Sequence, residues 1–336
     1  MLTLAWLAAL IGISTALVWQ GSLYLEGAAD RLALYYGLPA IVQGALIAAA
    51  GSSFPELASV VIATLRYGEF ELGVAAIVGS AVFNVLVIPA LSALAHQDTL
   101  ESSRALVYRE AQFYIISVTV LLLTFSLAVI YYPTGGEGLF GQITRPLALF
   151  PLALYGLYLF IQYQESADYT PDTDLPQLNV FRQWGVLAAG LVLILLGVEV
   201  LVHAAVELGD YFGTPSFLWG LTVIAAGTSL PDTIISVRAA RSGSSTVSLA
   251  NVFGSNIFDL LVAVPVGVLL AGTTTIDFGV AAPLMAFLVV ATILVFTAAR
   301  TDFEVRSNEG WMLLAVYALF VGWMLLESTG VTSIVL

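Results

Sequence analysis

The stretch Gly51-Ser52-Ser53-Phe54-Pro55-Glu56 decides the fold, because it occurs again as Gly227-Thr228-Ser229-Leu230-Pro231-Asp232. Each copy places a carboxylate, hydroxyl groups and a helix-breaking proline inside a long apolar segment. A charged side chain at membrane depth costs roughly 2.5–3.5 kcal/mol on insertion scales, so such a residue marks a functional site by default. Two matched copies of this costly arrangement predict an internal repeat built around a functional pair of segments.

The composition indicates a helical membrane protein. Of the 336 residues, 60% are hydrophobic and 10% are charged, and the mean hydropathy is +0.97, whereas about 25% of the residues of soluble domains are charged. A bilayer core requires about 20 apolar residues per helix. We therefore predict an all-α polytopic membrane protein with ten transmembrane helices, without the short alternating segments of an outer-membrane barrel. The ten segments are expected near residues 3–26, 37–65, 70–95, 108–132, 146–163, 184–207, 213–239, 244–271, 278–299 and 309–327.

The cysteine count and the charge balance exclude several classes of function. The chain has no cysteine, so it can form neither a disulfide nor a thiolate metal site. All ten basic residues are arginines, against 23 acidic residues, and this balance argues against nucleic-acid binding. An acidic, lysine-free surface would suit the high internal salt of a halophilic prokaryote, which we state as a hypothesis. We expect no organic cofactor and no obligate protein partner.

The chain divides into two repeats. Residues 1–163 form a predicted first five-helix repeat with its motif region at 44–84, and residues 184–336 form a second with its motif region at 220–259. Because five is an odd number, the second repeat must run upside down relative to the first, as in many secondary transporters. Residues 164–183 are the predicted acidic linker. Three aspartates in it have a loose calcium-loop spacing, but the glycine and final glutamate of an EF-hand are missing: Asp168, Asp172 and Asp174.

The arginines predict how the chain is oriented in the membrane. Arg66 and Arg145 fall in one set of predicted loops. The other set contains the remaining eight: Arg31, Arg104, Arg109, Arg182, Arg238, Arg241, Arg300 and Arg306. By the positive-inside rule the larger set is cytoplasmic, so both termini are expected outside the cell. The N-terminal segment is interpreted as the first spanning helix and not as a signal peptide, because it has no positive start.

The two motifs predict one shared cation site. Residues three or four apart share a helix face, which places Ser53 with Glu56 and Ser229 with Asp232. In the segments that follow, Ser80 shares a face with Asn84 and Ser255 shares one with Asp259. If the repeats pack around a twofold axis, these faces converge with carbonyls that the two prolines leave without helical donors.

The donor set of this predicted site consists of oxygen atoms. Oxygen ligation favours hard cations such as Ca²⁺, Na⁺ or Mg²⁺, and Ca²⁺ accepts 6–8 oxygens in a flexible geometry. Three buried carboxylates, Glu56, Asp232 and Asp259, cannot all stay charged without bound cations. The site is therefore occupied by a cation or partly protonated, and exchange of one ion for another is the natural activity.

Here the residues resemble a known family. Residues 226–232 with 254–259, and residues 51–56 with 78–84, are similar to the two α-repeats of sodium/calcium exchangers in the cation/calcium exchanger superfamily. The resemblance covers both repeats and implies a secondary antiporter, not an enzyme, in the cell membrane. It implies exchange of several Na⁺ for one Ca²⁺ by alternating access, in which the first and sixth helices slide across the remainder.

The resemblance also implies roles for individual residues. Glu56 and Asp232 would be the central Ca²⁺ carboxylates, which Na⁺ also uses, and Asn84 and Asp259 would complete the centre. The flanking Na⁺ sites would use three pairs of hydroxyls and one pair of carbonyls: Ser52 and Thr228, Ser53 and Ser229, Ser80 and Ser255, and the carbonyls of Ala49 and Ala225.

Several alternatives remain open at the level of sequence. Asp259 and the Ser-Leu-Pro-Asp sequence are closer to the potassium-dependent branch, which leaves K⁺ coupling open, and Ca²⁺/H⁺ antiport is a further alternative. An intramembrane protease would leave the duplicated acid motif unexplained. A cation channel is harder to exclude, although channels usually build their filters from several subunits around one axis, whereas the predicted site is completed within one chain. Glu199 and His203, four residues apart in a predicted span, form either a proton-sensitive gate or, as we favour, a structurally satisfied pair.

Overall fold

The computed structural model describes residues 2–37, 49–95, 99–103, 106–135, 138–165, 178–329 and 331–332. The helices of the first half are α1 (Leu2–Tyr35), α2 (Ala49–Ser52), α3 (Phe54–Ile62), η2 (Ala63–Tyr67), α4 (Phe70–Ala95), η3 (Leu106–Glu110), α5 (Ala111–Tyr131) and α6 (Arg145–Glu165). Those of the second half are α7 (Val180–Phe212), α8 (Ser216–Trp219), η4 (Gly220–Ile224), α9 (Ala225–Thr228), α10 (Leu230–Arg241), α11 (Ser245–Phe258), η5 (Asp259–Ala263), α12 (Val264–Ala271), α13 (Phe278–Arg300) and α14 (Ser307–Ser328). The strands are β1 (Thr99–Glu101), β2 (Phe140–Thr144), β3 (Thr273–Asp277) and β4 (Glu304–Arg306).

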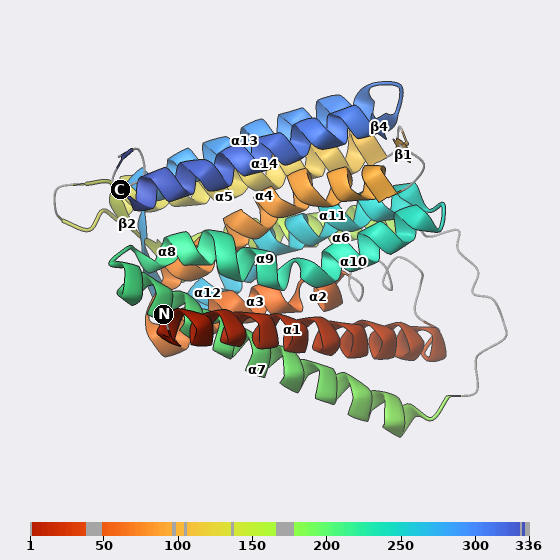
Figure 1. Ribbon diagram of the computed structural model, residues 1–336, viewed down its shortest axis with the longest axis horizontal. Coiled ribbons are helices and arrows are strands. Elements are labelled where there is room, and N and C mark those ends of the chain that lie inside the picture. Colours follow the sequence, from red (N-terminus) through yellow and green to blue (C-terminus); the bar gives the residue numbers. More distant parts are fainter. Residues whose placement is uncertain are drawn as a thin grey trace.

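The predicted fold class is confirmed, because the protein is a bundle of long apolar helices (Figure 1). Eight helices of the described residues are long and apolar enough to cross a membrane, and the bent segment from α8 to α10 makes nine. The predicted helix over 37–65 includes residues 38–48, which lie outside the described part. The count of ten spans therefore stays a prediction, as do the repeat boundaries, because residues 166–177 of the linker also lie outside it.

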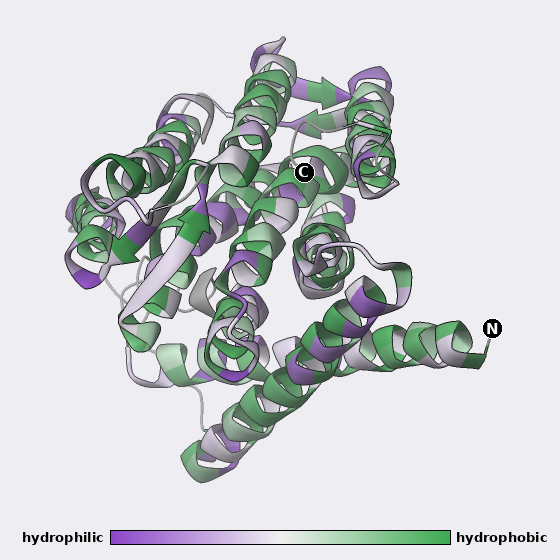
Figure 2. Ribbon diagram, turned by 90° about the vertical axis from the view of Figure 1, so that its left-hand side faces the viewer, coloured by the Kyte–Doolittle hydropathy of each residue, from purple (hydrophilic) through white to green (hydrophobic). Residues whose placement is uncertain are grey.

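Side-chain burial distinguishes the central helices from those that face lipid. Most side chains of α4 and α11 are buried, and Figure 2 shows hydrophobic residues along most of the length of the helices. Large apolar side chains remain exposed on outer helices, among them Trp6, Phe160 and Leu319. Exposed apolar surface of this extent is expected where lipid, and not water, covers the protein.

Two long helices, α1 and α7, pack side by side and antiparallel (Figure 1). A Cβ atom on Gly21 would lie 2.8 Å from Gly190 O, and one on Gly197 would lie 2.9 Å from Ser14 O. The later residue of α1, Gly21, contacts the earlier residue of α7, Gly190, and the earlier residue of α1, Ser14, contacts the later Gly197, so the two helices are antiparallel. These glycines allow the two helix backbones to approach closely.

The predicted ends of these two helices were wrong. The predicted segments 3–26 and 184–207 stop short of α1, which continues to Tyr35, and of α7, which continues to Phe212. Hydropathy marks the part of a helix that lies in lipid, whereas the helix itself ends at its capping residue. Gly213, with φ of 64°, ends α7 in the left-handed conformation that glycine adopts without strain.

Four short strands, which the sequence analysis did not predict, join loops from the two halves. β1 pairs with β4, with Leu100 opposite Val305, and β2 pairs with β3, with Gln142 opposite Thr275. The two sheets lie at opposite ends of the bundle, and both termini lie at the end that holds β2 (Figure 1). We refer to the two ends as the β1–β4 end and the β2–β3 end.

Both motifs interrupt their helices at a serine. Ser53 separates α2 from α3, and Ser229 separates α9 from α10, where the helix axis bends by 44°. Each following proline lies in the first turn of the new helix, where its missing N–H costs no hydrogen bond. The bends place each motif carboxylate in the first turn of a helix at the centre of the protein.

We predict that Gly79→Ala destabilises the protein by about 1–3 kcal/mol, as overpacking of a tight contact does. A Cβ atom on Gly79 would overlap the carbonyl oxygen of Leu221, so α4 and η4 would have to separate. Gly156→Ala on α6 is the matched control, because nothing lies within 4 Å of its Cβ position. Thermal unfolding in detergent measures both, and equal midpoints for the two variants would contradict the close packing.

Candidate cation site

Three carboxylates from three helices are buried near enough to interact electrostatically, although among the described residues no three acidic side chains lie close enough together to hold a metal ion by themselves. Glu56 lies on α3, Asp232 on α10 and Asp259 at the first residue of η5, and each is at most 1% exposed. The charge of Asp259 interacts with those of Glu56 and Asp232, and Glu56 also interacts with Asp232. Like charges repel strongly where water is excluded. This cluster, which we call the carboxylate cage, therefore requires cations or protons to neutralise it.

Serine hydroxyls connect each motif to the central helix of the opposite half. Ser80 Oγ on α4 lies 2.8 Å from Ser229 Oγ and donates to Glu56 Oε1 at 3.4 Å. Ser52 Oγ lies 3.1 Å from Ser255 Oγ on α11. These four serines are at most 2% exposed, so the structure brings together residues that the sequence analysis assigned to one site.

Amide side chains support one side of the carboxylate cage. Asn84 Nδ2 donates to Asp232 Oδ2 at 3.5 Å and to Asn256 Oδ1 at 3.0 Å, and Asn251 Nδ2 donates to Asp232 Oδ1 at 3.4 Å. Asn256 Nδ2 in turn donates to Tyr114 OH at 3.2 Å. The sequence analysis missed both Asn251 and Asn256. Asn251 was detectable in principle, because it shares a helix face with Ser255, four residues on.

Several oxygen atoms of the carboxylate cage have no hydrogen-bond donor. Among the described residues, no hydrogen bond of normal geometry reaches Glu56 Oε2, Asn84 Oδ1 or either carboxylate oxygen of Asp259, although the Thr228 hydroxyl lies near Glu56 and the Ser53 hydroxyl lies near Asp259. No arginine of the described part pairs with these three side chains. Buried acceptors without donors are costly, and carboxylate and amide oxygens of this kind are the ligands that hard cations prefer.

The remaining predicted ligands lie on the same segments. Ser53 Oγ donates to Ser255 O at 3.4 Å. Thr228 Oγ1 donates to the carbonyl of Ala225 at 3.3 Å, and this carbonyl also accepts the amide of Ser229 at 3.0 Å. The Ala225 carbonyl is therefore partly engaged by its own helix. Ala49 is the first residue of α2.

Glu199 forms an ion pair with an arginine that the sequence analysis assigned to a loop and did not connect with Glu199. Its Oε1 atom lies 2.8 Å from Arg66 Nε and accepts a hydrogen bond from Tyr67 OH at 3.0 Å. Both partners belong to η2, so the contact joins α7 to the end of the first motif segment. His203 is exposed. The interpretation of Glu199 as a satisfied residue agrees with this geometry, although its partner is Arg66 and not His203.

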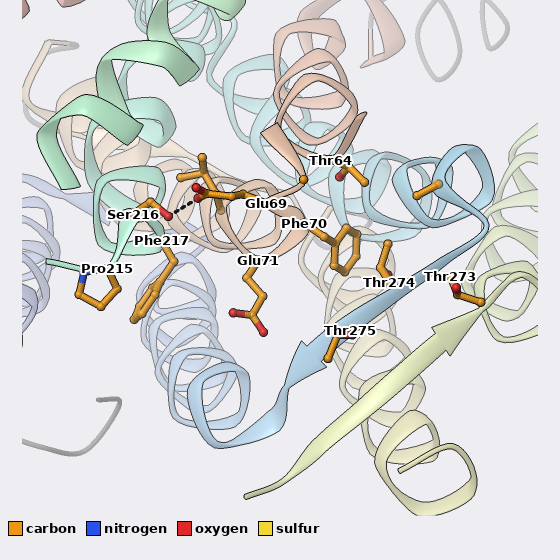
Figure 3. A pocket seen from close by; sticks show the side chains of 13 residues that line it. Thr64, Glu69, Phe70, Glu71, Pro215, Ser216, Phe217, Thr273, Thr274 and Thr275 are labelled. Atoms are coloured by element: carbon orange, nitrogen blue, oxygen red, sulfur yellow. Dashed lines mark hydrogen bonds between the residues drawn. The ribbon is translucent and has the colours of Figure 1, made fainter. Parts of the chain in front are cut away.

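A cavity of about 520 Å³ opens at the β2–β3 end, between the loops that precede α4 and α8 and strand β3 (Figure 3). Glu69 and Glu71 line it, together with Ser216 and the threonines of β3. Ser216 donates a hydrogen bond to Glu69, and Glu71 accepts the backbone amide of Asp277 at 2.8 Å. Both carboxylates therefore accept hydrogen bonds from the protein, whereas neither oxygen of Asp259 accepts one of normal geometry among the described residues.

Comparison with known proteins identifies relatives along most of the chain. A sequence model described as "Sodium/calcium exchanger protein" matches residues 6–164 and 182–326. CaxA of Alkalimonas amylolytica, by its name a proposed antiporter, is 31% identical over 269 residues, which cover 78% of this chain and 79% of that protein. The inner membrane protein YrbG of Escherichia coli is 27% identical over 271 residues, which cover 74% of this chain and 78% of that protein.

A solved structure has the same fold. The sodium-calcium exchanger NCX_Mj, soaked with 10 mM Na⁺ and zero Ca²⁺, superposes with a TM-score of 0.63. The match covers 94% of this chain and 98% of that one, with 22% sequence identity.

We predict that Asp259→Asn raises the thermal midpoint in cation-free buffer with chelator, because it removes one of three mutually repelling charges. The expected rise is roughly 2–4 °C for each kcal/mol of repulsion relieved. The same variant should lose most of the stabilisation that added Ca²⁺ gives the wild type. Asp210→Asn, at an exposed position on α7, should change neither value. A lower midpoint for Asp259→Asn without cations would contradict the repulsion.

Proposed function

The chain belongs to the sodium/calcium exchanger protein family, and from this premise we propose that it is a secondary antiporter that exchanges Na⁺ for Ca²⁺ across the membrane. The observation that carries the proposal is the set of donor-free oxygen atoms on Glu56, Asn84 and Asp259 at the centre of the bundle. A bound cation would give these acceptor oxygens the partner that the protein does not provide. Transport, and not chemical transformation, is the activity that such a site at mid-bundle supports.

The chemistry of the ligands favours Ca²⁺ as the divalent substrate. Mg²⁺ dehydrates reluctantly and demands octahedral geometry, whereas Ca²⁺ accepts more oxygens in flexible arrangements. Helices broken at Ser53 and Ser229 provide side chains and backbone from several directions, which suits the larger ion. We assign Glu56 and Asp232 as the central Ca²⁺ ligands, with Asn84 and Asp259 beside them. The serine and threonine hydroxyls and the carbonyls of the two motifs would bind Na⁺ when Ca²⁺ is absent.

The charge of the carboxylate cage explains why the two ions would exchange. Three buried carboxylates without cations are too costly to expose to alternating sides, so the protein changes state only when it is loaded. Ca²⁺ or several Na⁺ neutralise the same charges, and each therefore displaces the other. The close, glycine-lined contact between α1 and α7 joins them as one pair, which supports movement of this pair as a unit in the alternating step.

The arginines support an orientation with the β1–β4 end in the cytoplasm. Arg31 lies one turn before the end of α1, Arg182 lies in the first turn of α7 and Arg300 ends α13, and all of these helix ends lie at the β1–β4 end (Figure 1). Arg66 and Arg145 lie on η2 and α6, toward the β2–β3 end. This orientation places both termini outside the cell and is the one we propose, in the plasma membrane of the host.

Ca²⁺/H⁺ antiport and K⁺-dependent exchange are the second candidates, because Asp259 is a carboxylate where the first repeat has Asn84. An extra carboxylate can carry a proton or contribute to a K⁺ site. Reconstituted vesicles with Na⁺, K⁺ and H⁺ gradients imposed separately distinguish the three. Our proposal requires Ca²⁺ uptake driven by an outward Na⁺ gradient without K⁺. Uptake that ignores Na⁺ and follows a pH gradient would identify a Ca²⁺/H⁺ antiporter.

We predict that Glu56→Gln and Asp232→Asn each lower Na⁺-driven Ca²⁺ uptake to about 1% of the wild-type rate or less, because losing a charged ligand in a buried site costs about 3 kcal/mol or more. Radioactive Ca²⁺ uptake into proteoliposomes measures the effect. Glu101→Gln, at an exposed position on β1, is the control and should transport normally. Undiminished uptake by either of the two buried variants would refute the site assignment.

A further inference from the structure

Glu26 on α1 is a carboxylate that the carboxylate cage does not include and that neither motif contains. Its Cγ atom lies 3.4 Å from the Cβ position of Gly51, the first residue of the first motif. Its charge interacts with that of Asp232. We propose that Glu26 is a cation-binding carboxylate on one side of the carboxylate cage only, which receives ions arriving from the β1–β4 end and passes them to Asp232. The inference rests on the proposed exchange function.

The surroundings of Glu26 lack the partners that a structural carboxylate has. Among the described residues, no donor reaches its buried Oε1 atom. Ser22, one helical turn earlier on the same face, is fully buried, and its hydroxyl also has no partner in the described part. Glu199 and Glu110, in contrast, are paired with arginines. A carboxylate and a hydroxyl that are both unpartnered on one helix face form an incomplete set of oxygen ligands, which a hard cation would complete.

The position of Glu26 gives the direction of the path. Asp30 follows it by one turn, is exposed, and interacts with it electrostatically. α1 continues from there to the β1–β4 end (Figure 1). The carboxylates of Asp232, Glu26 and Asp30 thus form a series from the buried site to the outside at that end. Such a series lowers the free-energy cost of dehydrating an arriving cation, because carboxylate oxygens replace its water ligands one after another.

Next to the second motif, the described residues place no carboxylate at the position that corresponds to Glu26. The position of Gly227 in the second motif corresponds to that of Gly51 in the first. The Cβ position of Gly227 contacts Leu201 Cδ2 of α7 at 2.8 Å, and the nearest polar atom is the hydroxyl of Thr15 at 3.1 Å. An apolar leucine therefore lies where the first repeat has Glu26. The two repeats differ in charge along the ion path, so the effect of Glu26 should be restricted to one face of the membrane.

The test compares Glu26→Gln with wild type in right-side-out and everted membrane vesicles, with Ca²⁺ as the probe. On the face of the β1–β4 end, the apparent KM for Ca²⁺ should rise about tenfold, the effect of one charged contact of ordinary strength. On the opposite face the apparent KM should change less than about twofold, because there the arriving Ca²⁺ would not contact Glu26. Glu26→Asp keeps the charge and should recover part of the affinity. Glu207→Gln, exposed on α7, is the control and should behave as wild type on both faces.

The outcomes separate this inference from the proposed function. If wild-type vesicles show no Na⁺-driven Ca²⁺ uptake, the proposed function fails. If the wild type exchanges normally and Glu26→Gln leaves KM unchanged on both faces, or changes it equally on both, the one-sided role of Glu26 is refuted. The thermal midpoint of each variant is measured alongside, and a Glu26→Gln protein that folds normally but loses Vmax with KM unchanged would also refute the inference.

Discussion

Mutual repulsion among Glu56, Asp232 and Asp259 is the constraint on which the structure depends. All three are buried, and no arginine of the described residues neutralises them. The surrounding hydroxyl and amide groups reduce this cost only in part, because both oxygens of Asp259 remain without a donor. The protein thus keeps a buried acidic centre whose charges must be neutralised by protons or by bound cations. This requirement is consistent with the matched breaks at Ser53 and Ser229, which bring both motif carboxylates to the centre of the protein.

The two halves share an outline but differ in charge. Gly37 and Gly213, which align in the sequence, have φ values of 62° and 64°, and Gly68 and Gly243 have 70° and 80°. The repeats therefore share backbone geometry at equivalent turns. Their side chains diverge in charge at the centre, since Asn84 corresponds to Asp259. In the proposed exchange, a symmetric frame would give access from either side in turn, while unequal charges would allow the two sides to differ in affinity for the ion.

The sequence was sufficient for the fold class, for the family resemblance and for the residues that gather at the centre. Hydropathy, helical spacing and a doubled motif can all be recognised from residues that lie close together in the sequence, so the sequence was enough to predict these features. The ion-binding role of those residues stays a prediction, as does the count of ten helices. Asn256, Glu26 and the Arg66 partner of Glu199 were missed because their importance comes from packing between helices distant in sequence. The strands were missed because three to five residues in a loop carry little periodic signal.

The central claim is that Ca²⁺ and Na⁺ use one and the same set of buried carboxylates. Equilibrium binding of radioactive Ca²⁺ to the purified protein in detergent, titrated with Na⁺ at constant ionic strength, tests it most directly. We predict that Na⁺ displaces the bound Ca²⁺ completely and with a steep, cooperative dependence on its concentration, because several Na⁺ are needed to neutralise the same charges. Ca²⁺ that stays bound at saturating Na⁺ would contradict the shared site.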